Sequence, residues 1–235
     1  QDVPSRRGLE GGIALLLERE RTLVAEFGRK LLAEGLTRGT GGNLSAIDRE
    51  RGLVAVKPSA VEYLETGPED IAVVDLEGRQ VAGPWKPSSE TPMHLALYRG
   101  RPDVGAVVHA HSPFATTLAC LEREIPPVHY LVTLAGPSVP CTPYVPFGSQ
   151  ELAESALAGI GTGKAVLLGH HGLVTVGADM EEAFAIASAV EFAAEITWRA
   201  SCVETPPVLS PEQVADAVKR MARYGRSAPA PGEGS

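Results

Sequence analysis

Four of the six histidines fall into two tight groups, and imidazole is a common ligand of transition metals. His109 and His111 stand two apart at the end of an apolar run, so on a β-strand their side chains leave the same face. His170 and His171 follow a second apolar run, residues 165–168, and adjacent strand residues point to opposite faces. One of these two can therefore join the first pair, although the spacing does not choose between them. Three imidazoles would leave a cation with an open coordination position, which is typical of catalytic rather than structural sites.

These patterns also have ordinary interpretations. An isolated His-x-His pair more often faces solvent or makes simple hydrogen bonds than binds a metal. Glu90 stands where a helix is predicted to begin, and an acid there is usually only a favourable partner for the helix dipole. Ser88 and Ser89 precede it, however, and free N–H groups and hydroxyls at a helix start bind anions well. We therefore expect an anionic substrate group to bind beside this carboxylate.

Two further segments are small, polar and rich in hydrogen-bond donors. They are the Thr-Gly-Gly-Asn segment at residues 40–43 and the Lys-Pro-Ser turn at residues 57–59. Each is by itself more typical of a simple turn than of a binding loop.

The elements that must position these residues can be read from apolar spacing and turn residues. Helices are expected over residues 13–34, 88–99, 150–157, 178–200 and 211–224, with another from Ser112. Short strands are expected over residues 44–47, 53–56, 71–76, 80–82, 105–111, 125–130, 138–141, 165–168 and 173–176. Strands and helices alternate without a strict βαβ rhythm, which predicts a single α/β domain with a mainly antiparallel central sheet and helices on both faces. We expect a flexible leader at 1–12, one domain at 13–226 and a disordered tail at 227–235.

Composition narrows the function classes. The 235 residues are 44% hydrophobic and 21% charged, which excludes disordered and collagen-like chains. The net charge of −8 argues against nonspecific binding to nucleic acid or to an anionic membrane. The apolar stretch at residues 183–198 is interrupted by acids and too short to span a bilayer.

The three cysteines point to a reducing compartment. Cys120, Cys141 and Cys202 are far apart, odd in number and form no Cys-x-x-Cys, so neither a disulfide framework nor a cysteine zinc site is indicated. Arg6-Arg7 precedes a short apolar run, as in a twin-arginine export signal, but charged residues interrupt the run and no cleavage site follows. We therefore expect a cytoplasmic protein.

Five segments, in this order, give the chain a resemblance to a known family. They are Gly-Thr-Gly-Gly-Asn-Leu-Ser at 39–45, Pro-Ser-Ser-Glu at 87–90, His-Ala-His at 109–111, His-Tyr at 129–130 and Gly-His-His-Gly at 169–172. Together they resemble the class II aldolase/epimerase family, over residues 31–224. The resemblance implies a homotetramer with active sites between neighbouring subunits.

The resemblance also implies roles for single residues. His109, His111 and His171 would be the zinc ligands, and Glu90 the catalytic acid/base, able to approach the metal. Tyr130 would exchange a proton with the oxygen at the scissile carbon. The residues implied to hold the substrate phosphate are Gly42, Asn43, Ser59, Ser88 and Ser89. The residues implied to shape the aldehyde side of the site are Thr40, Phe147 and Tyr224, the last as a mobile residue that closes it.

The implied reaction is retro-aldol cleavage of a ketose 1-phosphate, such as L-fuculose 1-phosphate, to dihydroxyacetone phosphate and an aldehyde. Zn²⁺ would stabilise the enediolate as a Lewis acid, with Co²⁺ or Mn²⁺ able to replace it at a three-histidine site. No lysine is needed for a Schiff base, so Lys57, Lys86 and Lys164 are interpreted as surface or phosphate-side charges.

Three other functions remain open at this stage. The same fold includes sugar-phosphate 4-epimerases and sugar-acid lyases or decarboxylases, and the non-catalytic head domain of adducin, which lacks the metal residues. The segment at 125–149 is more similar to the aldolase branch than to the epimerases. One departure stands out: Ala60 occupies a position where the family often has glycine, and alanine would strain the phosphate loop if its φ is positive.

Overall fold

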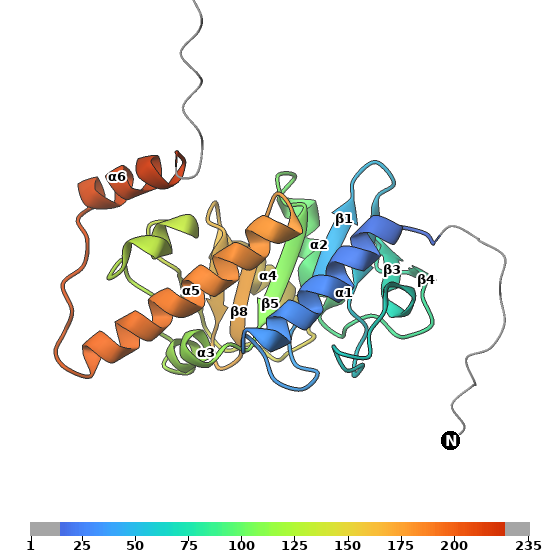
Figure 1. The fold of residues 1–235 in the computed structure, drawn as a ribbon, viewed down its shortest axis with the longest axis horizontal. Coiled ribbons are helices and arrows are strands. Elements are labelled where there is room, and N and C mark those ends of the chain that lie inside the picture. The colour runs from blue at the N-terminus through green and yellow to red at the C-terminus, as the bar shows by residue number, and fades with distance from the viewer. Residues whose placement is uncertain (1–14, 224–235) are drawn as a thin grey trace, which may run out of the picture.

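The computed structural model describes residues 15–223, which build one eight-stranded sheet with helices on both faces (Figure 1). The strand order is β4-β3-β2-β1-β5-β8-β7-β6, and each neighbouring pair is antiparallel except β6–β7. The strands are β1 (Asn43–Asp48), β2 (Leu53–Val56), β3 (Ala72–Asp75), β4 (Gln80–Ala82), β5 (Ala106–Ala110), β6 (Cys141–Thr142), β7 (Ala165–Leu168) and β8 (Gly172–Gly177). The predicted fold class is confirmed.

Two hydrophobic cores lie on opposite faces of this sheet. Helices α1 (Glu18–Ala33), α3 (Pro113–Cys120) and α5 (Met180–Ser201) cover one face, and α2 (Thr91–Gly100) and α4 (Gln150–Ile160) cover the other (Figure 1). Central strands are therefore apolar on both sides, as β5 shows: Val108 faces the α1/α5 core and Val107 the α2/α4 core. By the same alternation, His109 faces the α2 side of the sheet.

The last helix stands apart from these layers. Helix α6 (Pro211–Met221) packs against the 3-10 helix η2 (Tyr130–Leu134), beyond the edge of the main sheet (Figure 1). A second 3-10 turn, η1 (Pro68–Asp70), precedes β3. The leader at 1–12, the tail at 227–235 and Tyr224 fall outside the described residues.

Most predicted elements are present, but the segment at 125–141 differs. The strand expected over 125–130 is wrong: Ile125 makes only an isolated bridge to Val139, because Pro126 and Pro127 have no N–H to donate to a ladder. The chain then enters η2 at Tyr130. The strand expected over 138–141 is reduced to Cys141–Thr142, after Pro140.

Helix α2 also begins differently from the expected hydroxyl cap. Glu90 itself is the N-cap residue, and its side chain makes no capping hydrogen bond. The Thr91 N–H donates to the carbonyl of Ser88, and Pro92 stands in the first turn as expected. The Glu90 carboxylate is consequently free to point away from its own helix and into the neighbouring cavity.

Among the described residues, no helix has the length and apolar character needed to cross a membrane. All three cysteines are free.

Candidate active site

Three strand ends and one helix start meet at one point of the sheet. His109 and His111 leave the end of β5, His171 stands in the tight turn between β7 and β8, and Glu90 begins α2 on the same face. Strands β5 and β8 are hydrogen-bonded neighbours, so the two histidine groups are brought together by the sheet itself.

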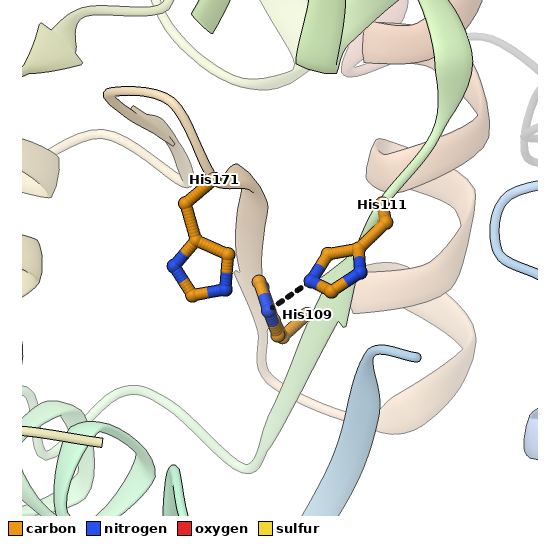
Figure 2. Close-up of side chains that lie close together, drawn as sticks. All are labelled: His109, His111 and His171. Atoms are coloured by element: carbon orange, nitrogen blue, oxygen red, sulfur yellow. Dashed lines mark hydrogen bonds between the residues drawn. The ribbon is translucent and has the colours of Figure 1, made fainter. Parts of the chain in front are cut away.

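The three imidazoles converge (Figure 2). The Nε2 atoms of His109 and His111 are 3.0 Å apart, and the ring centroid of His171 is 4.8 Å from that of His109 and 5.2 Å from that of His111. Candidate ligand atoms of all three lie within 4.8 Å of one another. The structure thus selects His171 rather than its neighbour: His170 has a φ of 55°, and its Nε2 lies 3.7 Å from Glu122, outside the cluster.

Glu90 completes the cluster. Its Oε2 lies 3.2 Å from Nε2 of His109, and its Oε1 lies 3.1 Å from Nε2 of His171. The carboxylate is buried, and burial alone would raise its pKa, but the facing imidazoles of His109 and His171 lower the pKa well below its ordinary value. Burial alone would lower the pKa of His109, but the adjacent Glu90 carboxylate raises it above its ordinary value. Burial and the neighbouring imidazoles lower the pKa of His111 to about 4.

The arrangement of nitrogen atoms fits a divalent cation. Nδ1 of His109 lies 2.9 Å from the carbonyl of Leu173, which only accepts, so Nδ1 carries a hydrogen and the lone pair of the neutral ring is on Nε2. That nitrogen faces His111 Nε2 and a carboxylate oxygen, as the ligands of a shared cation do. Hydrogen bonding of the outer ring nitrogen to a carbonyl is also typical of metal-bound histidine. Glu90 Oε1 is likewise buried, and it faces Nε2 of His171.

Two glycines make room for this cluster. A Cβ on Gly172 would lie 2.5 Å from the carbonyl oxygen of Ala110 and 2.9 Å from the His111 ring. A Cβ on Gly42 would lie 2.6 Å from the carbonyl oxygen of His109, and Gly42 has a φ of 67°. Both positions therefore require glycine so that the backbone can approach the histidines closely.

A cavity of about 440 Å³ opens beside the cluster. Its lining combines Glu90, His111 and His171 with the three donor-rich segments expected from the sequence. Two of these segments are joined: the Ser89 N–H donates to Ser59 Oγ, and the Ser88 N–H donates to the Lys57 carbonyl. The expected site residues among the lining are Thr40, Gly42, Asn43, Ser59, Ser88, Ser89 and Phe147.

Lys57 was predicted to be either a surface charge or a charge on the phosphate side of the site, and it is not a surface charge. It lines this cavity but is 2% exposed, and its Nζ donates to the carbonyls of Pro58 and Val61. Burial lowers the pKa of Lys57 to about 8. Lys86 is exposed, and Lys164 forms an ion pair with Glu182.

Tyr130 does not join the cluster within one chain. It is 49% exposed and lines a separate cavity of about 740 Å³ beneath α6. Its ring packs on His129, 4.6 Å between centroids.

Sequence reasoning overlooked a set of buried polar residues behind Glu90. Asn43 Nδ2 donates to Glu90 Oε2 at 2.8 Å, and behind Asn43 lie His94, Ser45 and Tyr98, each at most 1% exposed. A signal was present, since Glu90, His94 and Tyr98 stand four residues apart, on one face of the predicted helix.

Comparison with known proteins agrees with this geometry. The chain belongs to the family described as "Class II Aldolase and Adducin N-terminal domain", which matches residues 22–198. It is 43% identical to a 5-deoxy-D-ribulose 1-phosphate aldolase of Bacillus thuringiensis serovar kurstaki, over 90% of this chain and all of the relative.

Two other relatives extend the comparison. A 5-methylthioribulose-1-phosphate/5-deoxyribulose-1-phosphate aldolase of Rhodospirillum rubrum is 40% identical, over 86% of this chain and 91% of the relative. A solved structure named L-fuculose 1-phosphate aldolase superposes with a TM-score of 0.86 at 37% identity, covering 90% of this chain and all of the other.

Proposed function

We propose that this protein catalyses metal-dependent retro-aldol cleavage of a ketose 1-phosphate to dihydroxyacetone phosphate and an aldehyde. The observation that carries the proposal is the convergence of three imidazoles and one buried carboxylate at the floor of a cavity walled by donor-rich loops. The names of the relatives cited above, all aldolases of ketose 1-phosphates, support the same class of substrate.

His109, His111 and His171 would hold the cation, with Glu90 beside it. Zn²⁺ is our first choice, and Co²⁺ and Mn²⁺ also suit three nitrogen ligands. The cation supplies Lewis-acid stabilisation of the negative charge that develops on the carbonyl oxygen.

The residues of the chain would handle binding and protons. Gly42, Asn43, Ser59, Ser88 and Ser89 would bind the phosphate, holding the scissile bond over the cluster. Tyr130 would take the proton from the hydroxyl at the carbon that leaves as the aldehyde. As the carbon–carbon bond breaks, its electron pair stays on the fragment next to the carbonyl. Glu90 would pass a proton from solvent to that carbon, and the proton taken by Tyr130 would return to solvent, so that no net proton is gained or lost.

The remaining roles concern the substrate's far end and the assembly. Thr40 and Phe147 would contact the aldehyde portion, and Tyr224 would close over it. Because Tyr130 lies outside the cavity of its own chain, we propose that it serves the site of a neighbouring subunit in a homotetramer. We place the enzyme in the cytoplasm.

The test is an assay coupled to dihydroxyacetone phosphate, with 5-deoxyribulose 1-phosphate, 5-methylthioribulose 1-phosphate and L-fuculose 1-phosphate as substrates. Glu90→Gln should keep the bound metal and lower kcat by about 10³-fold or more, because the variant has lost its acid/base group. Wild-type cleavage by this variant would contradict the role of Glu90. Conversion of a pentulose phosphate without release of dihydroxyacetone phosphate would identify an epimerase instead.

A further inference from the structure

A ladder of buried polar side chains runs from Glu90 into the protein between α2 and β1. Glu90, His94 and Tyr98 lie four residues apart and so share one face of α2, while Asn43 and Ser45 lie two apart and share one face of β1. The contacts alternate between the two elements: Glu90 Oε2 to Asn43 Nδ2 at 2.8 Å, Asn43 Oδ1 to His94 Nε2 at 2.5 Å, His94 Nδ1 to Ser45 Oγ at 2.6 Å, and Ser45 Oγ to Tyr98 Oη at 2.7 Å.

The chemistry of these groups fixes the direction of the first two hydrogen bonds, and a neutral His94 ring fixes that of the other two. A carboxylate only accepts, so the Asn43 amide must present its NH₂ group to Glu90 and its carbonyl oxygen to His94. That oxygen also only accepts, so Nε2 of His94 carries a hydrogen. In a neutral ring Nδ1 is then the acceptor, the hydroxyl of Ser45 donates to it, and Tyr98 donates to Ser45.

The surroundings of His94 favour that neutral ring. The side chain is fully buried, no carboxylate contacts it, and burial lowers the pKa of His94 to about 3, with the nearby His109 acting in the same direction. All four residues behind Glu90 are at least nine-tenths buried, so water does not compete for their hydrogen bonds.

We propose that His94, held as the Nε2-protonated neutral tautomer by Ser45 and Tyr98, is a positioning residue that orients the Asn43 amide and through it the Glu90 carboxylate. The inference rests on the proposed role of Glu90 as the acid/base. Without the His94 donor, the Asn43 amide could rotate and turn its carbonyl oxygen toward the carboxylate. Since Nδ2 has two hydrogens and only one points to Glu90, the same orientation leaves the second available to substrate in the cavity that Asn43 lines.

The first experiment is independent of activity. A long-range ¹H–¹⁵N NMR spectrum of the metal-loaded wild type, assigned by comparison with His94→Gln, should show His94 protonated at Nε2 and unprotonated at Nδ1 at neutral pH. Protonation at Nδ1, or at both nitrogens, would overturn the proposal. This result is decisive even if the protein turns over none of the ketose 1-phosphates.

The second experiment separates positioning from a structural role. His94→Phe keeps a ring but removes the donor, and should lower kcat about 10- to 100-fold while metal content and KM change little. His94→Gln can still donate an N–H to Asn43, and should recover kcat to within about fivefold of wild type. Equal losses of kcat in the two variants would overturn the proposal.

A matched pair supplies the control. Ser45→Ala removes the hydroxyl that holds the tautomer and should lower kcat, but it should add little in the His94→Phe background, where the ladder is already broken. Thr175→Val removes another fully buried hydroxyl, which donates to the Ala183 carbonyl outside this ladder, and should leave kcat unchanged. Equal kcat losses in Ser45→Ala and Thr175→Val would contradict a specific ladder.

Discussion

The histidine half and the loop half of the site are built in different ways. His109, His111 and His171 stand at or beside the ends of hydrogen-bonded central strands, with His109 fully buried. The facing wall consists of loops, where Ser59 and Ser89 are exposed and Phe147 is 73% exposed. The sheet thus positions the proposed metal ligands, while the residues proposed to contact the substrate lie on loops, which tolerate change more readily.

The difference suggests how one fold serves several sugar phosphates. The relatives are named for different substrates, 5-deoxyribulose 1-phosphate and L-fuculose 1-phosphate, although this chain matches both over about 90% of its length. We infer that the strand-borne half sets the chemistry, and that the loop residues proposed for the aldehyde end, Thr40 and Phe147, set the choice of substrate.

The largest expected effect comes from breaking the strand-borne half. His111→Ala removes one of the three proposed nitrogen ligands and should lose both bound metal and at least about 10³-fold in activity, because two imidazoles do not hold a catalytic cation tightly. Metal content measured by mass spectrometry checks this. The matched variant His170→Ala lies outside the cluster and should keep its metal; metal loss there, or retention in His111→Ala, would contradict the ligand assignment.

A smaller effect is expected from changing Tyr130, which lies outside the histidine cluster of its own chain. Tyr130→Phe should lower kcat about 10²-fold through loss of the group that takes the hydroxyl proton, with little change in metal content. If Tyr130 serves a neighbouring site, co-expression of Tyr130→Phe with Glu90→Gln should restore activity in about a quarter of the sites, since random assembly brings two intact residues together at that frequency. Co-expressed variants that remain as inactive as either alone would contradict a shared site.

The same division decides what the sequence could predict. The spacing of His109 and His111 places both side chains on one face of a strand, whatever the fold. The segments at 40–43 and 57–59 can be recognised from their composition of small, polar residues. The choice between His170 and His171 could not come from spacing, because it depends on the φ of 55° in the turn after β7.

Other features depend on contacts distant in sequence. The ladder behind Glu90 joins residues about 50 positions apart, so it exists only once β1 lies beneath α2. The burial of Lys57 likewise follows from two loop carbonyls and the Tyr63 ring, 4.4 Å from its Nζ, closing around it. The mistaken strand at 125–130 had the right apolar character, and only its two prolines argued against it.

The smallest expected effect tests the loop-borne half by itself. Ala60, which stands where the family often has glycine, has a φ of 56°, the positive value at which alanine is strained. It lines the cavity next to Ser59. Ala60→Gly relieves about 1 kcal/mol of backbone strain but adds freedom to the unfolded chain, so its free energy of unfolding should stay within about 1 kcal/mol of wild type. Ala60→Val places a branched side chain in the same conformation and should be less stable than Ala60→Gly by more than about 1 kcal/mol, as urea unfolding can measure. Both variants should keep their metal, because the histidines stand on strands that this loop does not hold. Equal stabilities for the glycine and valine variants would show that position 60 is not held in the left-handed region.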